Sequence, residues 1–358
     1  MSRWQLATGR WLAVALAALL LGAAGPVPRC DPNGADFCAL DRPEDLAFVD
    51  RSSWLVVSQA DLHVPLLLLD TQSGARVPIS ATATASSSPP TRAALGAPDC
   101  PGPPQQLKAG GNDVRRVGRH LQLAVINRAE PSRIEMFTLE LTRLAPRVSW
   151  RGCIPVPTHY SLNDVALGPG GELYATHMFE RPQTPADGQA LRERFLSAAP
   201  TGYAVRWTRP EGWTRVAGTD VSFANGIAVS ADGHRLAVSG TFDQAVVLME
   251  RATGATRRIP VALQPDNLTP LPDGGFLVAG HTGVPVTGID PCRAPQSTPC
   301  GFPFVIAEIA PSGNVRRVFA HDGTRIPGAS VAVVRGQRLY LGSAFGDRIS
   351  VVELSLKP

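Results

Sequence analysis

One unit recurs along the 358 residues of this chain: a short polar step, a hydrophobic strand, a Gly or Asp-Gly turn, and a second hydrophobic strand. The clearest copy runs from Phe223 to Val238, with its turn at Asp232-Gly233. The six copies begin at Glu44, Asn112, Leu162, Phe223, Pro265 and Ser330. A strand pair that returns roughly every 40–70 residues is typical of blades around an axis. We therefore predict an all-β fold, a six-bladed β-propeller that residues 30–358 form as one domain.

The polar steps of the repeat predict a metal site. Equivalent positions of a radial repeat point to the same place, the central channel, and five of the six copies carry Asn, Asp or Glu there. Mixed carboxylate and amide oxygens suit Ca²⁺, a hard cation that accepts irregular geometry. The predicted ligands are Glu44, Asn163, Asn225, Asp266 and Asn267. Taken singly, each is also an ordinary turn residue that bonds nearby backbone, but their recurrence favours the metal.

Residues 1–25 have the composition of a secretory signal peptide. Arg3 and Arg10 form a basic start, an apolar stretch of about 15 residues follows, and residues 23–25 are small enough for cleavage. A membrane-spanning helix usually needs about 20 apolar residues, so an uncleaved anchor is the weaker interpretation. We expect an exported protein, periplasmic or secreted, with no stable membrane insertion after signal cleavage.

The cysteines of an exported chain indicate disulfides. The chain has six, which allow 15 pairings that sequence alone cannot choose among. Proximity favours two small loops, Cys30–Cys38 and Cys292–Cys300. Cys100 and Cys153 remain; they precede the second and third copies of the repeat, so neighbouring blades could bring them together. A zinc site is the alternative, but the chain has no CxxC and no paired His.

The charge pattern gives no sign of a nucleic-acid partner. The formal charge is +4, nearly all the basic residues are Arg, and they are scattered. No basic run is interleaved with aromatic residues, so we expect no nucleic acid to bind.

Two segments depart from the strand pattern. Residues 80–90 are rich in Ser, Thr and Ala and are interpreted as a surface loop. Residues 179–200 show helical spacing at 190–196 and are predicted to form a short helix that covers one face of the propeller.

Four motifs in order resemble a known superfamily. They are Pro43-Glu44-Asp45, Leu162-Asn163-Asp164-Val165, Ala224-Asn225-Gly226-Ile227 and Pro265-Asp266-Asn267-Leu268. Together they are similar to the senescence marker protein/gluconolactonase and paraoxonase group of calcium-dependent propeller hydrolases, with diisopropyl fluorophosphatases as relatives, over roughly Cys38 to Leu356. The resemblance implies that Glu44, Asn163, Asn225 and Asp266 hold a catalytic calcium, joined by Asn267 in the paraoxonase-like branch. It also implies a second, structural calcium at Asp45 and Asp164.

The chain departs from this group where paraoxonase-like enzymes carry two histidines. Those places read Gly110-Gly111 and Asn127-Arg128, so the histidine pair is absent and its proton chemistry does not carry over. Arg128 is a candidate to bind a substrate carboxylate or phosphate through its planar fork, with a plain salt bridge as the alternative. His281 follows the fifth repeat, as a His does in paraoxonase-like chains, and is a candidate for the pocket mouth; a loop histidine is the alternative.

The resemblance and the ligand set favour a calcium-dependent hydrolase of a small-molecule lactone or related ester. Ca²⁺ would polarise the carbonyl, and Asp266 is the candidate base or nucleophile. The alternative is a non-catalytic binding or scaffold propeller that keeps the metal for stability. The missing histidines favour this alternative, whereas the intact ligand set favours the hydrolase.

Overall fold

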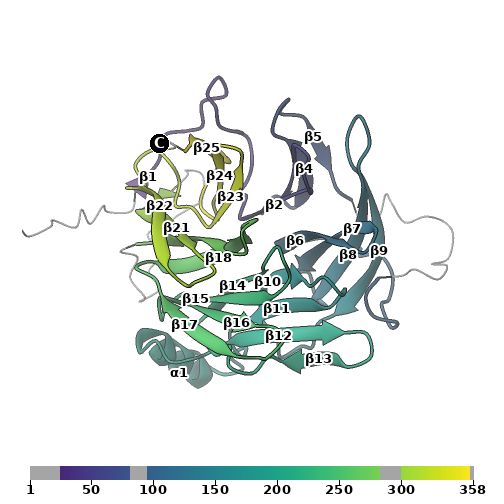
Figure 1. Ribbon diagram of the computed structural model, residues 1–358, viewed down its shortest axis with the longest axis vertical. Helices are drawn as coiled ribbons and strands as arrows, with labels where there is room; N and C mark the ends of the chain where they lie inside the picture. Colours follow the sequence, from purple (N-terminus) through teal and green to yellow (C-terminus); the bar gives the residue numbers. More distant parts are fainter. Residues whose placement is uncertain (1–24, 81–94, 283–299, 355–358) are drawn as a thin grey trace, which may run out of the picture.

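The computed structural model describes residues 25–80, 95–282 and 300–354. Six antiparallel sheets stand around a central axis (Figure 1), which confirms the predicted six-bladed β-propeller. Residues 1–24 of the predicted signal peptide, residues 81–90 of the predicted loop, and Cys292 lie outside the described residues.

Each blade is an antiparallel meander. Blades one and two are β2 (Asp45–Phe48), β3 (Trp54–Ser58), β4 (Leu66–Asp70), β5 (Arg76–Pro78), and β6 (Ala109–Val117), β7 (His120–Asn127), β8 (Arg133–Glu140), β9 (Arg147–Pro155). Blades three and four are β10 (Leu162–Leu167), β11 (Leu173–His177), β12 (Tyr203–Thr208), β13 (Gly212–Arg215), and β14 (Ala224–Val229), β15 (Arg235–Gly240), β16 (Ala245–Glu250), β17 (Thr256–Pro260). Blades five and six are β18 (Gln264–Pro270), β19 (Phe276–His281), β21 (Phe304–Ile309), β22 (Val315–His321), and β23 (Val331–Arg335), β24 (Arg338–Gly342), β25 (Ser350–Glu353). A short pair, β1 (Gly25–Pro26) with β20 (Cys300–Gly301), lies apart from the blades.

The six sequence repeats form the first two strands of the six blades. The first strands contact one another around the ring, in the order β2, β6, β10, β14, β18, β23 and back to β2. They therefore line the central channel, and the polar step of each repeat lies where the chain enters this innermost strand.

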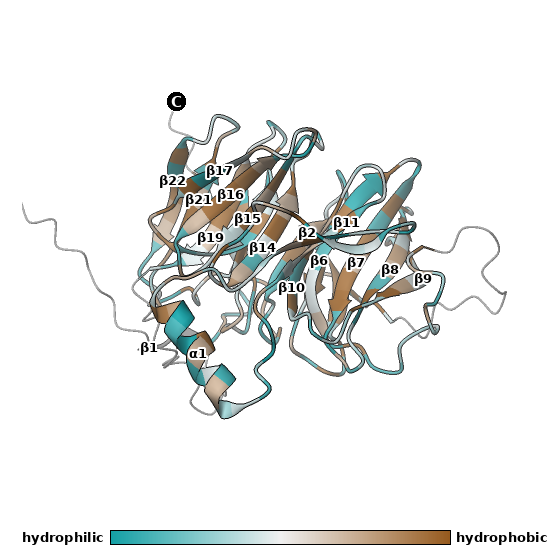
Figure 2. Cartoon of the chain, turned by 90° about the horizontal axis from the view of Figure 1, so that it is seen from below, coloured by the Kyte–Doolittle hydropathy of each residue, from teal (hydrophilic) through white to brown (hydrophobic). Residues whose placement is uncertain are grey.

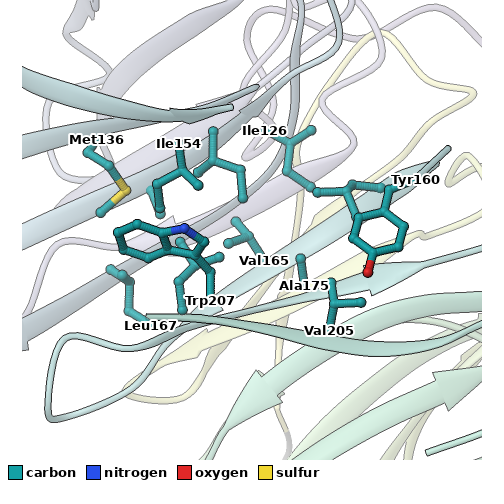
Figure 3. Close-up of a cluster of buried hydrophobic side chains, with 13 residues drawn as sticks. Ile126, Met136, Ile154, Tyr160, Val165, Leu167, Ala175, Val205 and Trp207 are labelled. Carbon is teal, nitrogen blue, oxygen red and sulfur yellow. The ribbon is translucent and has the colours of Figure 1, made fainter. Parts of the chain in front are cut away.

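Apolar side chains pack the blades against one another. Between blades two and three, Ile126 and Ile154 meet Val165 and Trp207 in one buried cluster (Figure 3). A strand covered on both faces, such as β3, is buried along its whole length and therefore reads as a nearly continuous hydrophobic run.

The N-terminal segment closes the ring. Blade six has three strands, and Phe37 adds an antiparallel bridge to Ile349 at the start of β25. The Leu40 N–H donates to the Asp347 carbonyl at 3.1 Å, and the Arg42 N–H donates to the Gly346 carbonyl at 2.8 Å. This segment then leads into β2, so it ties the last blade to the first.

Two predicted disulfides are confirmed. Cys30–Cys38 and Cys100–Cys153 have Cα–Cα distances of 5.5 and 5.3 Å. The first lies in the closing segment. The second joins the approach to blade two to β9, the outer strand of the same blade.

The predicted helix is also present. α1 (Pro185–Leu196) begins after Thr184, whose side chain accepts from the Asp187 N–H while the Asp187 carboxylate accepts from the Thr184 N–H. Figure 2 shows α1 outside the sheets, at one end of the propeller. Its Phe195 ring lies 5.6 Å from that of Phe223 and 4.9 Å from that of Phe242, at the start of β14 and after β15. No helix in the described ranges is long and apolar enough to cross a membrane.

Candidate metal site at the channel mouth

β-Bulges position the polar side chains of the repeat. Four innermost strands shift register near their start: Ala109/Asn112 in β6, Leu162/Val165 in β10, Ala224/Ile227 in β14 and Pro265/Leu268 in β18. Asn163, Asn225, Asp266 and Asn267 lie within three of these bulges. A bulge leaves residues outside the regular ladder and re-aims their side chains, so these polar groups can meet at one end of the channel.

Contacts join the five predicted ligands in two groups. Asn163 Nδ2 donates to Asn225 Oδ1, and the Asn225 side chain hydrogen-bonds Asp266. Asn267 Nδ2 donates to the Glu44 carbonyl at 3.3 Å. The structure thus brings together side chains from blades one, three, four and five; their role as metal ligands stays a prediction.

The Arg128 guanidinium lies among these oxygens. Its Nη2 donates to Asn163 Oδ1 at 2.9 Å, and its Nη1 approaches Glu44 Oε2 at 3.5 Å. Arg128 thus forms the salt bridge of the alternative interpretation with Glu44 and a hydrogen bond with Asn163, and both partners are predicted ligands.

The Asp266 carboxyl is buried beside other charged groups. Burial raises the pKa of its carboxyl well above the usual value, and the charges of Glu44 and Asp45 raise it further. The Asn225 hydrogen bond and the Arg128 charge act in the opposite direction. A raised pKa makes the carboxylate a stronger base once it is ionised, and a nearby cation favours this ionised form.

Asp45 and Asp164, the predicted second metal pair, make hydrogen bonds between blades. Asp45 Oδ2 accepts from the Asn112 N–H at 2.5 Å, and Asp164 Oδ2 accepts from the Ile227 N–H at 2.8 Å. Both side chains line the channel below the mouth, a cavity of about 500 Å³. Burial raises the pKa of Asp45 to about 7 and that of Asp164 well above the usual value.

Asp113 also belongs to this group, although it is not among the predicted metal ligands. Its Oδ2 accepts from the Leu167 N–H at 2.7 Å, which links blades two and three, and burial raises its pKa. The signal was the Asn-Asp pair of the second repeat, which matches Asn163-Asp164 of the third. In the same cavity the buried Asn112 Oδ1 has no hydrogen-bond partner among the described residues.

His281 lies at the end of β19, opposite Gln264 of β18. Its ring centroid is 4.4 Å from that of Phe302 and 5.9 Å from that of Phe345. The residue keeps part of its surface accessible, but Nε2 is shut off from solvent and has no partner among the described residues. Burial lowers the pKa of this imidazole to about 4, so it is neutral at pH 7.

The donor set at the mouth fits calcium by its chemistry. Two carboxylates and three amide oxygens are the hard ligands that Ca²⁺ takes. Within the described ranges no group of three or more His, Cys, Asp or Glu side chains is placed to hold a metal, so amides must complete any such site. A bound metal would also have to displace the Arg128 guanidinium from Glu44 and Asn163.

The fold and this mouth define a six-bladed propeller with an oxygen-rich site at one end of its channel. Residues 125–351, more than half of the chain, match the family model described as arylesterase. The chain belongs to this family, which is paraoxonase-like as the sequence motifs predict, and membership supports a hydrolase-type function.

Solved structures show the same fold at low identity. The chain is similar to a luciferin-regenerating enzyme, with 12% identity over 90% of this chain and 94% of that one and a TM-score of 0.54. It is also similar to a putative gluconolactonase, with 14% identity over 93% and 92% and a TM-score of 0.52. A Bacteroides thetaiotaomicron protein of unknown function gives 12% identity over 92% and 76%, with a TM-score of 0.52. At these identities the likeness concerns the fold alone. No curated protein matches the chain by sequence.

Proposed function

We propose that this protein is an exported, calcium-dependent hydrolase of lactones or related esters. The observation that carries the proposal is the meeting of Glu44, Asn163, Asn225, Asp266 and Asn267, from four blades, at one channel mouth. Membership of the arylesterase family supports the hydrolytic part.

These five residues would hold the metal, and bound Ca²⁺ supplies polarisation of the carbonyl oxygen. Asp266 takes the proton of the attacking water, whose oxygen forms a bond to the carbonyl carbon. The bond from that carbon to the ester or ring oxygen then breaks, and Asp266 returns the proton to the departing oxygen. Asn225 orients Asp266 through its hydrogen bond.

Export is part of the proposal. Residues 1–25 have the signal-peptide pattern, and two disulfides are of the kind that persists in oxidising compartments.

Turnover of a lactone and ester panel by purified protein, with and without calcium, tests the proposal. We expect hydrolysis that chelation abolishes and calcium restores, together with a rise in melting temperature on calcium addition. A calcium-dependent rise in melting temperature without any turnover would favour the non-catalytic scaffold. No response of either quantity would reject the calcium site.

A further inference from the structure

Arg128 is the residue of the mouth that the hydrolytic step does not use. Nη2 lies 2.9 Å from Asn163 Oδ1 and 3.4 Å from the Asn163 carbonyl, and Nη1 lies 3.5 Å from Glu44 Oε2. A guanidinium carries five N–H donors, and its Nε has no acceptor among the described residues. The side chain is 37% exposed, so it has donors left for an oxygen that arrives from solvent.

Gly110 makes room for this guanidinium. A Cβ at position 110 would lie 2.7 Å from Arg128 Nε and 3.0 Å from Cζ, closer than unbonded atoms approach. The Arg128 main chain is fixed separately, since its N–H donates to the Lys108 carbonyl at 2.8 Å. The guanidinium can therefore be displaced while the backbone stays in place. The two positions at which the sequence lacks histidines thus form one unit, a large cation beside a residue without a side chain.

We propose that Arg128 recognises a carboxylate on the substrate, and that metal binding releases it for this task by taking over Glu44 and Asn163. The inference rests on the proposed function. A metal ion and a guanidinium that bind the same carboxylate and amide repel each other at such distances, so the binding of one weakens the binding of the other. When Glu44 and Asn163 bind a metal, the Arg128 guanidinium loses the Glu44 carboxylate as its anionic partner. It then pairs with a different anion.

Formal charge favours an anionic substrate as that partner. Arg128 places one positive charge beside the two carboxyl groups of the mouth, those of Glu44 and Asp266. A bound divalent cation adds two more positive charges, which strengthens the attraction for a substrate carboxylate. A planar carboxylate also matches the guanidinium fork, which binds it through two parallel hydrogen bonds.

Three variants test the proposal: Arg128→Gln, Gly110→Ala and, as a matched control, Arg338→Gln. Arg338 pairs with Glu353 on the exposed side of blade six. Calcium affinity is measured by calorimetry on metal-free protein. Separately, kcat/KM at saturating calcium is measured for a γ-butyrolactone that carries a carboxylate and for the matching carboxamide.

We expect Arg128→Gln to bind calcium about fivefold more tightly, because a competing cation is gone. It should also lose a preference for the carboxylate substrate of about tenfold or more. Gly110→Ala should tighten calcium binding in the same way, since the added methyl displaces the guanidinium, but it should keep the carboxylate preference because the charge remains. Arg338→Gln should change neither quantity.

The possible negative results reject different parts of the proposal. Wild-type protein that binds no calcium rejects the proposed function and this inference together. Wild-type protein that binds calcium and hydrolyses both substrates equally well rejects the carboxylate specificity alone. Unchanged calcium affinity in both Arg128→Gln and Gly110→Ala rejects the competition, whatever the substrate profile.

Discussion

At the residue scale, the channel mouth brings two carboxylates, three amides and one guanidinium close together. Burial by itself would favour the neutral form of Asp266, and the neighbouring Glu44 charge adds to this effect. Asn225 and Arg128 oppose it. Asp266 is therefore the group whose protonation depends most directly on what occupies the mouth.

Asp266→Asn should reduce kcat by about 10²–10⁴ while the propeller stays folded. The amide still offers an oxygen to a metal, but it cannot accept the proton of the attacking water. Since calcium affinity should fall as well, kcat must be measured at calcium levels that saturate the variant. Asp273→Asn, at an exposed turn of the same blade, is the control and should retain activity. Near-normal turnover by saturated Asp266→Asn would mean that another group takes the proton.

His281→Phe should remove a pH dependence of stability. The folded pKa is about 4 and the unfolded value about 6.5, so between these pH values the unfolded chain binds a proton that the folded chain does not. The free energy of unfolding of the wild type therefore falls as pH drops from 6.5 to 4, by up to about 3 kcal/mol. Urea unfolding at pH 7 and at pH 4.5 measures this loss. We expect the variant to lose less than the wild type, and an equal loss in the two proteins would contradict the prediction.

At the scale of single elements, the strands and the helix are stabilised by different contacts. The innermost strand β14 is buried along its whole length, whereas α1 has no buried residue and begins at a capping box. Its aromatic contact through Phe195 joins it to the loops around β14 and β15. α1 is thus an element that can open locally while the sheets remain intact.

Phe195→Ala should loosen α1 without unfolding the propeller. We expect faster hydrogen exchange across residues 185–196, equivalent to about 1–2 kcal/mol less protection, and little change in melting temperature. Leu196→Ala is the control, because Leu196 is 49% exposed. A large fall in melting temperature for Phe195→Ala would show that the helix is part of the cooperative core.

At the scale of the whole molecule, a propeller must join its last blade to its first. The segment from Cys30 to Arg42 makes this joint along residues 346–349. Arg348 lies beneath it, with a side chain 6% exposed, and its Nε contacts Asp347 Oδ1 at 2.8 Å. Its Nη1 lies 3.9 Å from Asp36 Oδ2, and its Nη2 donates to the Pro28 carbonyl.

Arg348→Ala should weaken ring closure and cost about 2 kcal/mol of unfolding free energy. This is below the cost for a fully buried pair, since the carboxylate partners keep 27% and 30% of their side-chain surface exposed. Equilibrium urea unfolding measures it. Arg316→Ala removes an exposed pair with Glu308 and should change stability by less than about 0.5 kcal/mol. Equal effects of the two substitutions would contradict a closing role for Arg348.

The propeller can be predicted from the sequence alone, because the repeat is local. Each copy carries its own strand pair and turn, such as Ala224–Val229 with Arg235–Gly240, and six local units need only stack to bury their apolar faces. The same regularity marked Glu44, Asn163, Asn225 and Asp266 as neighbours, because equivalent positions of a ring meet at its axis. Proximity along the chain likewise favoured Cys30–Cys38.

The arrangement of the mouth could not be predicted from the sequence, because it depends on contacts between distant residues. The Arg128 guanidinium reaches Glu44, 84 positions away in the sequence, and fits because Gly110 has no side chain. Asp113 belongs with Asp45 and Asp164 because all three accept a backbone N–H from the next blade. Arg348 closes the ring through contacts with Pro28 and Asp36, at the opposite end of the chain. Such contacts depend on which side chains the closed ring brings together, whereas a repeat pattern records only what each blade does for itself.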